Sequence, residues 1–132
     1  VAVVGAGDSA AEEATYLANL CTKVHLIVRR DEMRASKIMQ QRVLNTPNIE
    51  IHWNTETDEI LGDDSGVTGV RLFNNKTSEK HEIQVQGFFL AIGHKPNTDI
   101  FKRYIDMDET GYIKVQPGST RTNVEGVFAV GD

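Results

Sequence analysis

The chain has 132 residues, of which 39% are hydrophobic and 25% are charged, and its formal net charge is −5 at pH 7. This composition is typical of one globular domain with its own core, and the negative charge argues against a nucleic-acid partner. No apolar run approaches the roughly 20 residues that a membrane-spanning helix needs, and no signal peptide opens the chain, so we expect no membrane contact and a cytoplasmic location.

The two ends of the chain favour a domain cut from a longer protein. The sequence opens directly in an apolar run at Val1, without an initiator methionine, and it stops at Asp132, just after the apolar residues 127–130. We therefore expect residues 1–132 to form a single domain excised from a longer chain.

Residues 1–10 read VAVVGAGDSA and predict a strand, a glycine-rich turn and the start of a helix. In this context a GxGxx[GA] pattern binds the pyrophosphate of a dinucleotide. Gly5 lies where the chain must reverse tightly, Gly7 where the backbone must approach the phosphates, and Ala10 where the helix must pack closely on its strand. The same pattern also occurs in tight strand-to-helix turns of unrelated α/β proteins, so both interpretations stay open at this point.

The start of the first helix adds two candidate residues. Residues 9–12, SAAE, have the form of a capping box, and apolar residues recur at helical spacing after them. The backbone amides of the first turn, which includes Asp8 and Ser9, would then face a pyrophosphate. The candidate cofactor-binding residues of this segment are therefore Gly5, Gly7, Asp8, Ser9 and Ala10.

An arginine pair follows the second expected strand, residues 23–28. At this distance from the glycine turn, a site selective for NAD carries an acidic residue that binds the ribose 2′-hydroxyl. This chain has Arg29 and Arg30 instead, with Arg34 shortly after. Guanidinium groups suit a dianionic 2′-phosphate, so the pattern predicts NADPH rather than NADH. The two acidic residues that follow the pair could instead neutralise it and leave a solvated charge cluster.

The rest of the chain alternates between strand and helix signals, with one interruption. Residues 34–45 carry an apolar stripe at helical spacing, and residues 49–53 read as a third strand. Short alternating runs separated by turn signals then predict an antiparallel β-meander, over residues 56–61, 67–73 and 81–85. Residues 88–92, FFLAI, read as the next buried strand. We therefore predict a Rossmann-like three-layer α/β fold, with a parallel sheet and an antiparallel β-meander inserted in a crossover.

The segment after this last strand is the other candidate ligand contact. Gly93 would let the backbone approach a ligand at the carboxyl edge of the sheet, and His94 either caps the strand end or transfers a proton. The other histidines, His25, His52 and His81, share no metal-ligand spacing with one another, so we expect no metal site. We find no nucleophile elbow, Walker loop or arguable carboxylate pair. The sequence therefore predicts binding chemistry and no catalytic residue.

Five segments carry a resemblance to a known family; in chain order they read GAGDSAAEEA, VRRDEMRA, GVTGVRL, AIGHKPNT and GVFAVGD. In this order and spacing they resemble the NADPH-binding domain of low-molecular-weight thioredoxin reductases, which are pyridine nucleotide-disulfide oxidoreductases. The resemblance covers the whole chain. Two related proteins stay as alternatives: a thioredoxin-reductase-like ferredoxin or flavodoxin reductase, which shares the arginine pair, and the flavoprotein subunit of alkyl hydroperoxide reductase, which lacks it. A nucleotide-sensing module without catalytic activity is the alternative of another class.

The resemblance implies roles for the candidate residues. Gly5, Gly7 and Ala10 would hold the pyrophosphate, Arg29, Arg30 and Arg34 the 2′-phosphate, Gly93 and His94 would border the nicotinamide, and Asp132 would contact FAD in the intact enzyme. It also implies that NADPH reduces FAD, and that FAD reduces a C-x-x-C pair that reduces thioredoxin, in a homodimeric parent. The FAD fingerprint and the C-x-x-C pair are absent from this sequence. We therefore expect the isolated fragment to bind NADPH and to be inactive.

Overall fold

The computed structural model describes residues 1–131. The chain divides into two compact units, Val1–Gly93 and His94–Asp132. The expectation of a single domain over residues 1–132 therefore stays a prediction. No helix among the described residues is long and apolar enough to cross a membrane.

The first unit is built on a parallel sheet that the chain enters in its middle. The elements of this part are β1 (Ala2–Val4), α1 (Asp8–Ala18), β2 (Val24–Ile27), α2 (Lys37–Leu44), β3 (Ile49–His52) and β7 (Phe88–Leu90). The strand order is β3-β2-β1-β7, and all three pairings are parallel. The chain thus builds β2 and β3 on one side of β1 and returns to add β7 on the other. Open α/β sheets bind their ligands where the strand order reverses in this way.

A three-stranded antiparallel sheet is inserted between β3 and β7. It consists of β4 (Thr55–Asp63), β5 (Gly66–Asn74) and β6 (Lys80–Gln84), in the order β4-β5-β6. The predicted meander is therefore confirmed; β4 and β5 extend further at both ends than the alternating pattern suggested, and β6 begins and ends one residue earlier.

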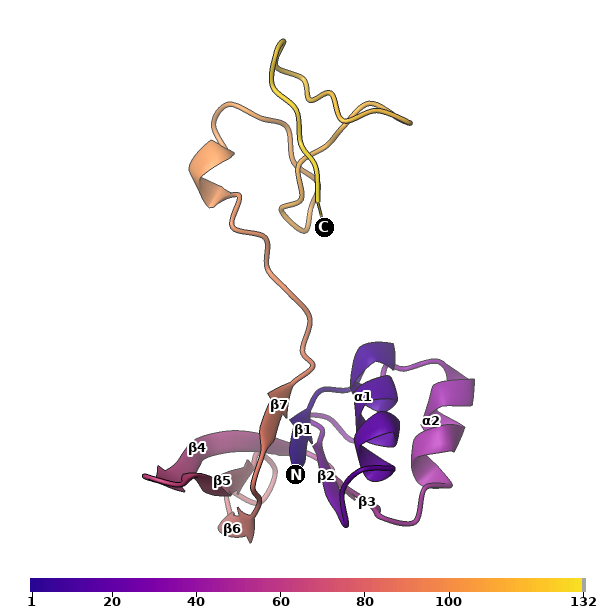
Figure 1. The fold of residues 1–132 in the computed structure, drawn as a ribbon, viewed down its shortest axis with the longest axis vertical. Helices are drawn as coiled ribbons and strands as arrows, with labels where there is room; N and C mark the ends of the chain where they lie inside the picture. The colour runs from indigo at the N-terminus through magenta and orange to yellow at the C-terminus, as the bar shows by residue number, and fades with distance from the viewer. Residues whose placement is uncertain (132) are drawn as a thin grey trace. The chain divides into compact units, whose positions relative to one another are not determined.

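The two faces of the parallel sheet have separate cores. Val3, Leu26 and Val28 pack with α1 and α2, whereas Ala2 and Ile27 pack with apolar residues of the meander. Figure 1 shows the two helices on one side of the sheet and the meander strands on the other. This arrangement confirms the predicted three-layer α/β fold, and it explains why β2 is an almost continuous apolar run: both of its faces are buried.

Two helix starts differ from the prediction. The N-cap of α1 is Gly7, no side chain caps the helix, and Ser9 lies inside its first turn, so the capping box is wrong. The second helix begins at Lys37 and not at Arg34. The backbone amides of Arg34 and Ala35 both donate hydrogen bonds to the carbonyl oxygen of Ala6, at 2.7 and 2.9 Å. These bonds hold residues 34–35 against the glycine turn, so the helix begins only at Lys37.

The last strand of the sheet also differs from the prediction. Residues 88–92 read as a buried strand, but β7 lies at the edge of the sheet with β1 as its neighbour. Phe89 and Leu90 are exposed. The apolar run alone cannot distinguish an edge strand from a central one.

The second unit has little regular structure. It contains the 3-10 helix η1 (Asp99–Phe101) and two isolated antiparallel bridges, Met107 to Ile113 and Arg121 to Phe128. Thr122 is buried in this unit, and its hydroxyl donates a hydrogen bond to the carbonyl oxygen of Val127 at 2.9 Å.

Candidate functional site

A pocket of about 440 Å³ lies at the carboxyl ends of β1, β2 and β7. Its walls come from the glycine turn, the arginine segment, the start of β4 and the end of β7; the lining residues are Val4, Gly5, Ala6, Ile27, Arg29, Arg30, Glu32, Arg34, Thr55, Glu56, Thr57, Leu90 and Ile92. The pocket therefore occupies the point where the strand order reverses, and its volume is within the range of small-molecule sites.

Gly5 is the residue that lets the surrounding elements approach one another. Its φ angle is +155°, and a Cβ atom there would lie 2.5 Å from the carbonyl oxygen of Ala91 and 2.6 Å from the Cβ of Ala10. Its amide donates to the carbonyl oxygen of Ile27 at 3.1 Å. The tight turn expected at Gly5 and the close helix packing expected at Ala10 are therefore both present, and their contact with a cofactor stays a prediction.

Gly7 has the opposite surroundings. Its backbone is extended, with φ −90° and ψ −177°, and a Cβ atom there would meet nothing within 4 Å. The turn thus leaves open space beside the N-terminus of α1, where backbone amides favour an anion.

The structure does not place the other residues of the turn in the pocket. Asp8 is exposed and accepts a hydrogen bond from the backbone amide of Ser36 at 2.8 Å, so its carboxylate connects the starts of the two helices. Ser9 is exposed and Ala10 is buried. Gly7, Asp8, Ser9 and Ala10 lie in or beside the first turn of α1 and do not line the pocket.

The backbone of the arginine pair is held by two asparagines that sequence reasoning missed. The amide of Asn54 donates to the carbonyl oxygen of Arg30 at 3.0 Å, and the side-chain amide of Asn75 donates to that of Arg29 at 2.9 Å. Asn54 has a positive φ of 52°, which asparagine tolerates better than most residues. An asparagine in a turn is the signal that could have singled out Asn54. No local signal could have found Asn75, because it lies 46 residues from Arg29 in the sequence.

The three arginines meet at the pocket without carboxylate partners. Arg29, Arg30 and Arg34 all line it and are exposed. Among residues 1–131, none of their guanidinium groups takes part in an ion pair. Glu32 lines the same pocket but is not paired with any of them. The ion pairs that the alternative interpretation requires are therefore absent from this part of the chain, and the guanidinium groups are available to an anion.

Thr57 contributes a polar atom that needs a partner. Its hydroxyl oxygen is buried in the wall of the pocket and has no hydrogen-bond partner among the described residues. A buried hydroxyl without a partner costs about 1–3 kcal/mol, which a polar ligand atom can offset. No signal in the sequence distinguishes this threonine from its neighbours in β4.

The remaining candidates lie elsewhere. Gly93 has a φ of +87°, and a Cβ atom there would meet nothing within 4 Å, but Gly93 does not line the pocket. His94 is exposed and is the first residue of the second unit. Asp132 lies outside the described residues.

Comparison with known proteins gives a consistent result. A protein-family model described as pyridine nucleotide-disulphide oxidoreductase matches residues 1–132. The chain is 55% identical over 130 residues to the thioredoxin reductase of Dictyostelium discoideum, covering 98% of this chain and 40% of that protein. It is 48% identical to the NADPH-dependent thioredoxin reductase 3 of Arabidopsis thaliana, covering 100% of this chain and 25% of that protein.

Solved structures agree with the sequence comparison. Thioredoxin reductase from Lactococcus lactis superposes with a TM-score of 0.83 at 39% identity, covering 99% of this chain and 43% of that chain. The enzyme from Giardia duodenalis superposes with a TM-score of 0.80 at 43% identity, with the same coverage. The chain spans less than half the length of each of these relatives.

Proposed function

Because the chain belongs to the pyridine nucleotide-disulphide oxidoreductase family, we propose that it is the NADPH-binding domain of a thioredoxin reductase. One observation carries the proposal. Arg29, Arg30 and Arg34 line a pocket at the reversal point of the sheet, and within residues 1–131 no ion pair engages them. The names of the relatives support the same assignment.

The residues present fit NADPH. A Cβ atom at Gly5 would collide with Ala91 and Ala10, whereas one at Gly7 would reach into open space. In our proposal the amides beside Gly7 bind the pyrophosphate, and the three guanidinium groups bind the 2′-phosphate through charge-assisted hydrogen bonds. Thr57 offers its hydroxyl to a polar atom of the nucleotide. When bound, NADPH supplies a hydride.

The proposal extends to the protein from which this chain comes. We expect Gly93 and His94 to border the nicotinamide and Asp132 to contact FAD. We expect the intact protein to be a cytoplasmic homodimer in which electrons pass from the flavin domain to a C-x-x-C pair and then to thioredoxin. The 132-residue chain alone should bind NADPH without turnover, because it has one cysteine and no FAD fingerprint.

The intact protein tests this function directly. It should contain FAD after purification and should reduce thioredoxin at the expense of NADPH. The variant Arg29→Ala/Arg30→Ala should raise the KM for NADPH at least tenfold, because each charged hydrogen bond contributes about 1.5–3 kcal/mol and about 1.4 kcal/mol is a factor of ten. Its kcat should change little, since these arginines bind a phosphate and not the reacting ring.

The experiment needs a control variant, and two results would contradict the proposed function. Arg42→Ala/Arg103→Ala removes two exposed arginines that do not line the pocket, and it should leave the KM unchanged. A protein without FAD that binds NADPH would favour the sensing module. A flavoprotein that reduces ferredoxin or flavodoxin but not thioredoxin would contradict the assignment of the electron acceptor.

A further inference from the structure

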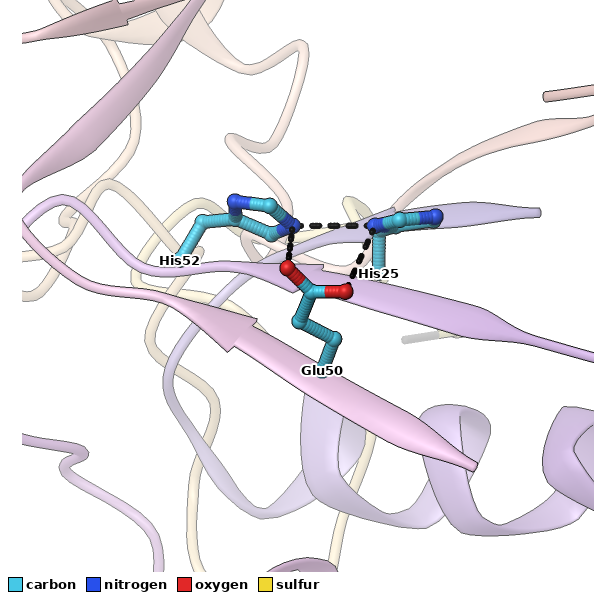
Figure 2. Close-up of side chains that lie close together, drawn as sticks. All are labelled: His25, Glu50 and His52. Carbon is cyan, nitrogen blue, oxygen red and sulfur yellow. Dashed lines mark hydrogen bonds and ion pairs between the residues drawn. The ribbon is translucent and has the colours of Figure 1, made fainter. Parts of the chain in front are cut away.

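Two histidines and a glutamate meet on the side of the parallel sheet that faces the meander. His25 belongs to β2, and Glu50 and His52 belong to β3. The parallel register pairs His25 with Glu50 and Ile27 with His52, so residues 27 apart in the sequence become neighbours. Figure 2 shows the three side chains converging. The cluster shares no residue with the arginine pocket.

The distances within the cluster are close to those between the ligand atoms of a metal ion. The Nδ1 atom of His25 lies 2.9 Å from the Nε2 atom of His52. The carboxylate of Glu50 lies 4.0 Å from the former nitrogen and 3.7 Å from the latter. Zinc takes nitrogen ligands at about 2.0–2.1 Å in a tetrahedron, whose ligand atoms are then about 3.3 Å apart. The observed distances lie on both sides of this value, so adjustments of less than about 1 Å produce the tetrahedral spacing.

The protonation of the two rings suits a cation. Burial lowers the pKa of His25 to about 4, with His52 as the second cause, and burial also lowers the pKa of His52. Both imidazoles are therefore neutral near neutral pH, and the short contact places one N–H against the lone pair of the other ring. Metal binding requires only that this proton move to the other nitrogen of its own ring. Both facing nitrogens, Nδ1 of His25 and Nε2 of His52, then present a lone pair to the ion, and no proton is released to solvent.

We propose that His25, Glu50 and His52 bind one divalent transition-metal ion of the zinc class, with a fourth position left for water. The two imidazole side chains are each 11% exposed, whereas Glu50 is 47% exposed and leaves the ion a path from solvent. The site could not be recognised from the spacing of the histidines in the sequence, because the site depends on the register between β2 and β3.

Lys23 sets the affinity of the site. Its ammonium group forms an ion pair with the same carboxylate oxygen of Glu50 that faces His25. This cation both occupies a ligand and repels an incoming ion, and its side chain is exposed and able to move away. Removal of the Lys23 charge should therefore strengthen metal binding.

Calorimetric titration of the EDTA-treated chain with zinc chloride tests the proposal. The wild-type chain should bind one zinc ion, and zinc should raise its melting temperature. His52→Gln and Glu50→Gln should each weaken binding at least tenfold and lose this thermal shift. Lys23→Gln should bind zinc several-fold more tightly than the wild type, which loss of folding cannot cause. His94→Gln and Glu12→Gln remove an exposed histidine and an exposed glutamate outside the cluster and should bind as the wild type does.

Circular dichroism of each variant without metal establishes that it is folded. Glu50 is the most exposed of the three ligands, so Glu50→Gln keeps the test valid if His52→Gln fails to fold. The proposal is overturned if the wild-type chain does not bind zinc. It is equally overturned if the folded Glu50→Gln chain binds zinc with unchanged affinity.

Discussion

Gly5 and Gly7 belong to one turn, but the structure requires glycine only at Gly5. At Gly5 the constraint is internal, because a methyl group would strike the backbone of Ala91 and the side chain of Ala10. At Gly7 nothing within 4 Å opposes a methyl group, and the backbone is extended. The fold therefore does not require glycine at this second position, and in our proposal its role is to let the nucleotide approach the backbone.

A pair of alanine substitutions separates these two reasons. Gly5→Ala should lower the free energy of unfolding by about 2–4 kcal/mol, because overpacking and an unfavourable φ add together. Gly7→Ala should lower it by less than about 1 kcal/mol, the cost of alanine at an N-cap, and yet weaken NADPH binding. Urea unfolding and NADPH titration of both variants measure the two effects. A Gly5→Ala chain as stable as the Gly7→Ala chain would show that the contacts of Gly5 with Ala91 and Ala10 do not constrain the fold.

The strand β2 shows which properties of an element its sequence determines. Its apolar run predicted a buried parallel strand, because only a strand covered on both faces needs so few polar residues. The run could not show that His25 lies against His52, since this contact depends on the neighbouring strand and its register. The helix starts failed for a similar reason: the contacts of Asp8 and Ala6 with the segment 34–36 are tertiary, and they override the local capping signal.

The buried histidine pair predicts a pH dependence of stability. The pKa of His25 is lowered from 6.5 to about 4 in the folded chain, and the pKa of His52 is lowered as well. The unfolded chain therefore binds more protons as the pH falls below 6.5, so stability is fully present above this value and is lost progressively towards pH 4. His25 alone should account for about 2 kcal/mol between about pH 7.5 and about pH 5.

Urea unfolding at several pH values in EDTA measures this loss. His25→Gln should reduce the dependence by about the 2 kcal/mol assigned to His25. His94→Gln, which removes an exposed histidine, should retain the full dependence. A wild-type chain with constant stability over this pH interval would show that His25 titrates normally in the folded state.

In the first unit, the order of the strands brings segments that are far apart in the sequence to one pocket. The glycine turn and the arginine pair were predicted from adjacent residues, because each depends on short segments next to β1 and β2. The order β3-β2-β1-β7 then brings Leu90 and Ile92 to the same pocket, together with Thr57 of the meander. Thr57 and Asn75 could not be found from the sequence, because their roles arise from a sheet that is inserted far along the chain.

Charge at this scale is distributed unevenly. The chain carries a formal net charge of −5, yet three arginines line one pocket. A net charge of this sign does not attract an anionic ligand, so the proposed binding of NADPH rests on the local arrangement of guanidinium groups and helix amides. Selective binding of a nucleotide that carries a 2′-phosphate would therefore show that the arginines form a nucleotide site and are not a cluster of exposed surface charges.

The most direct measurement is calorimetric titration of this chain with NADPH and with NADH, repeated on Arg29→Ala/Arg30→Ala and on the control Arg42→Ala/Arg103→Ala. We expect the wild type and the control to prefer NADPH at least tenfold. The arginine-pair variant should lose this preference, at about 1.5–3 kcal/mol for each charged hydrogen bond removed, while its affinity for NADH changes little. Equal affinity of the wild type for the two nucleotides, or a preference that survives the substitution, would contradict the account.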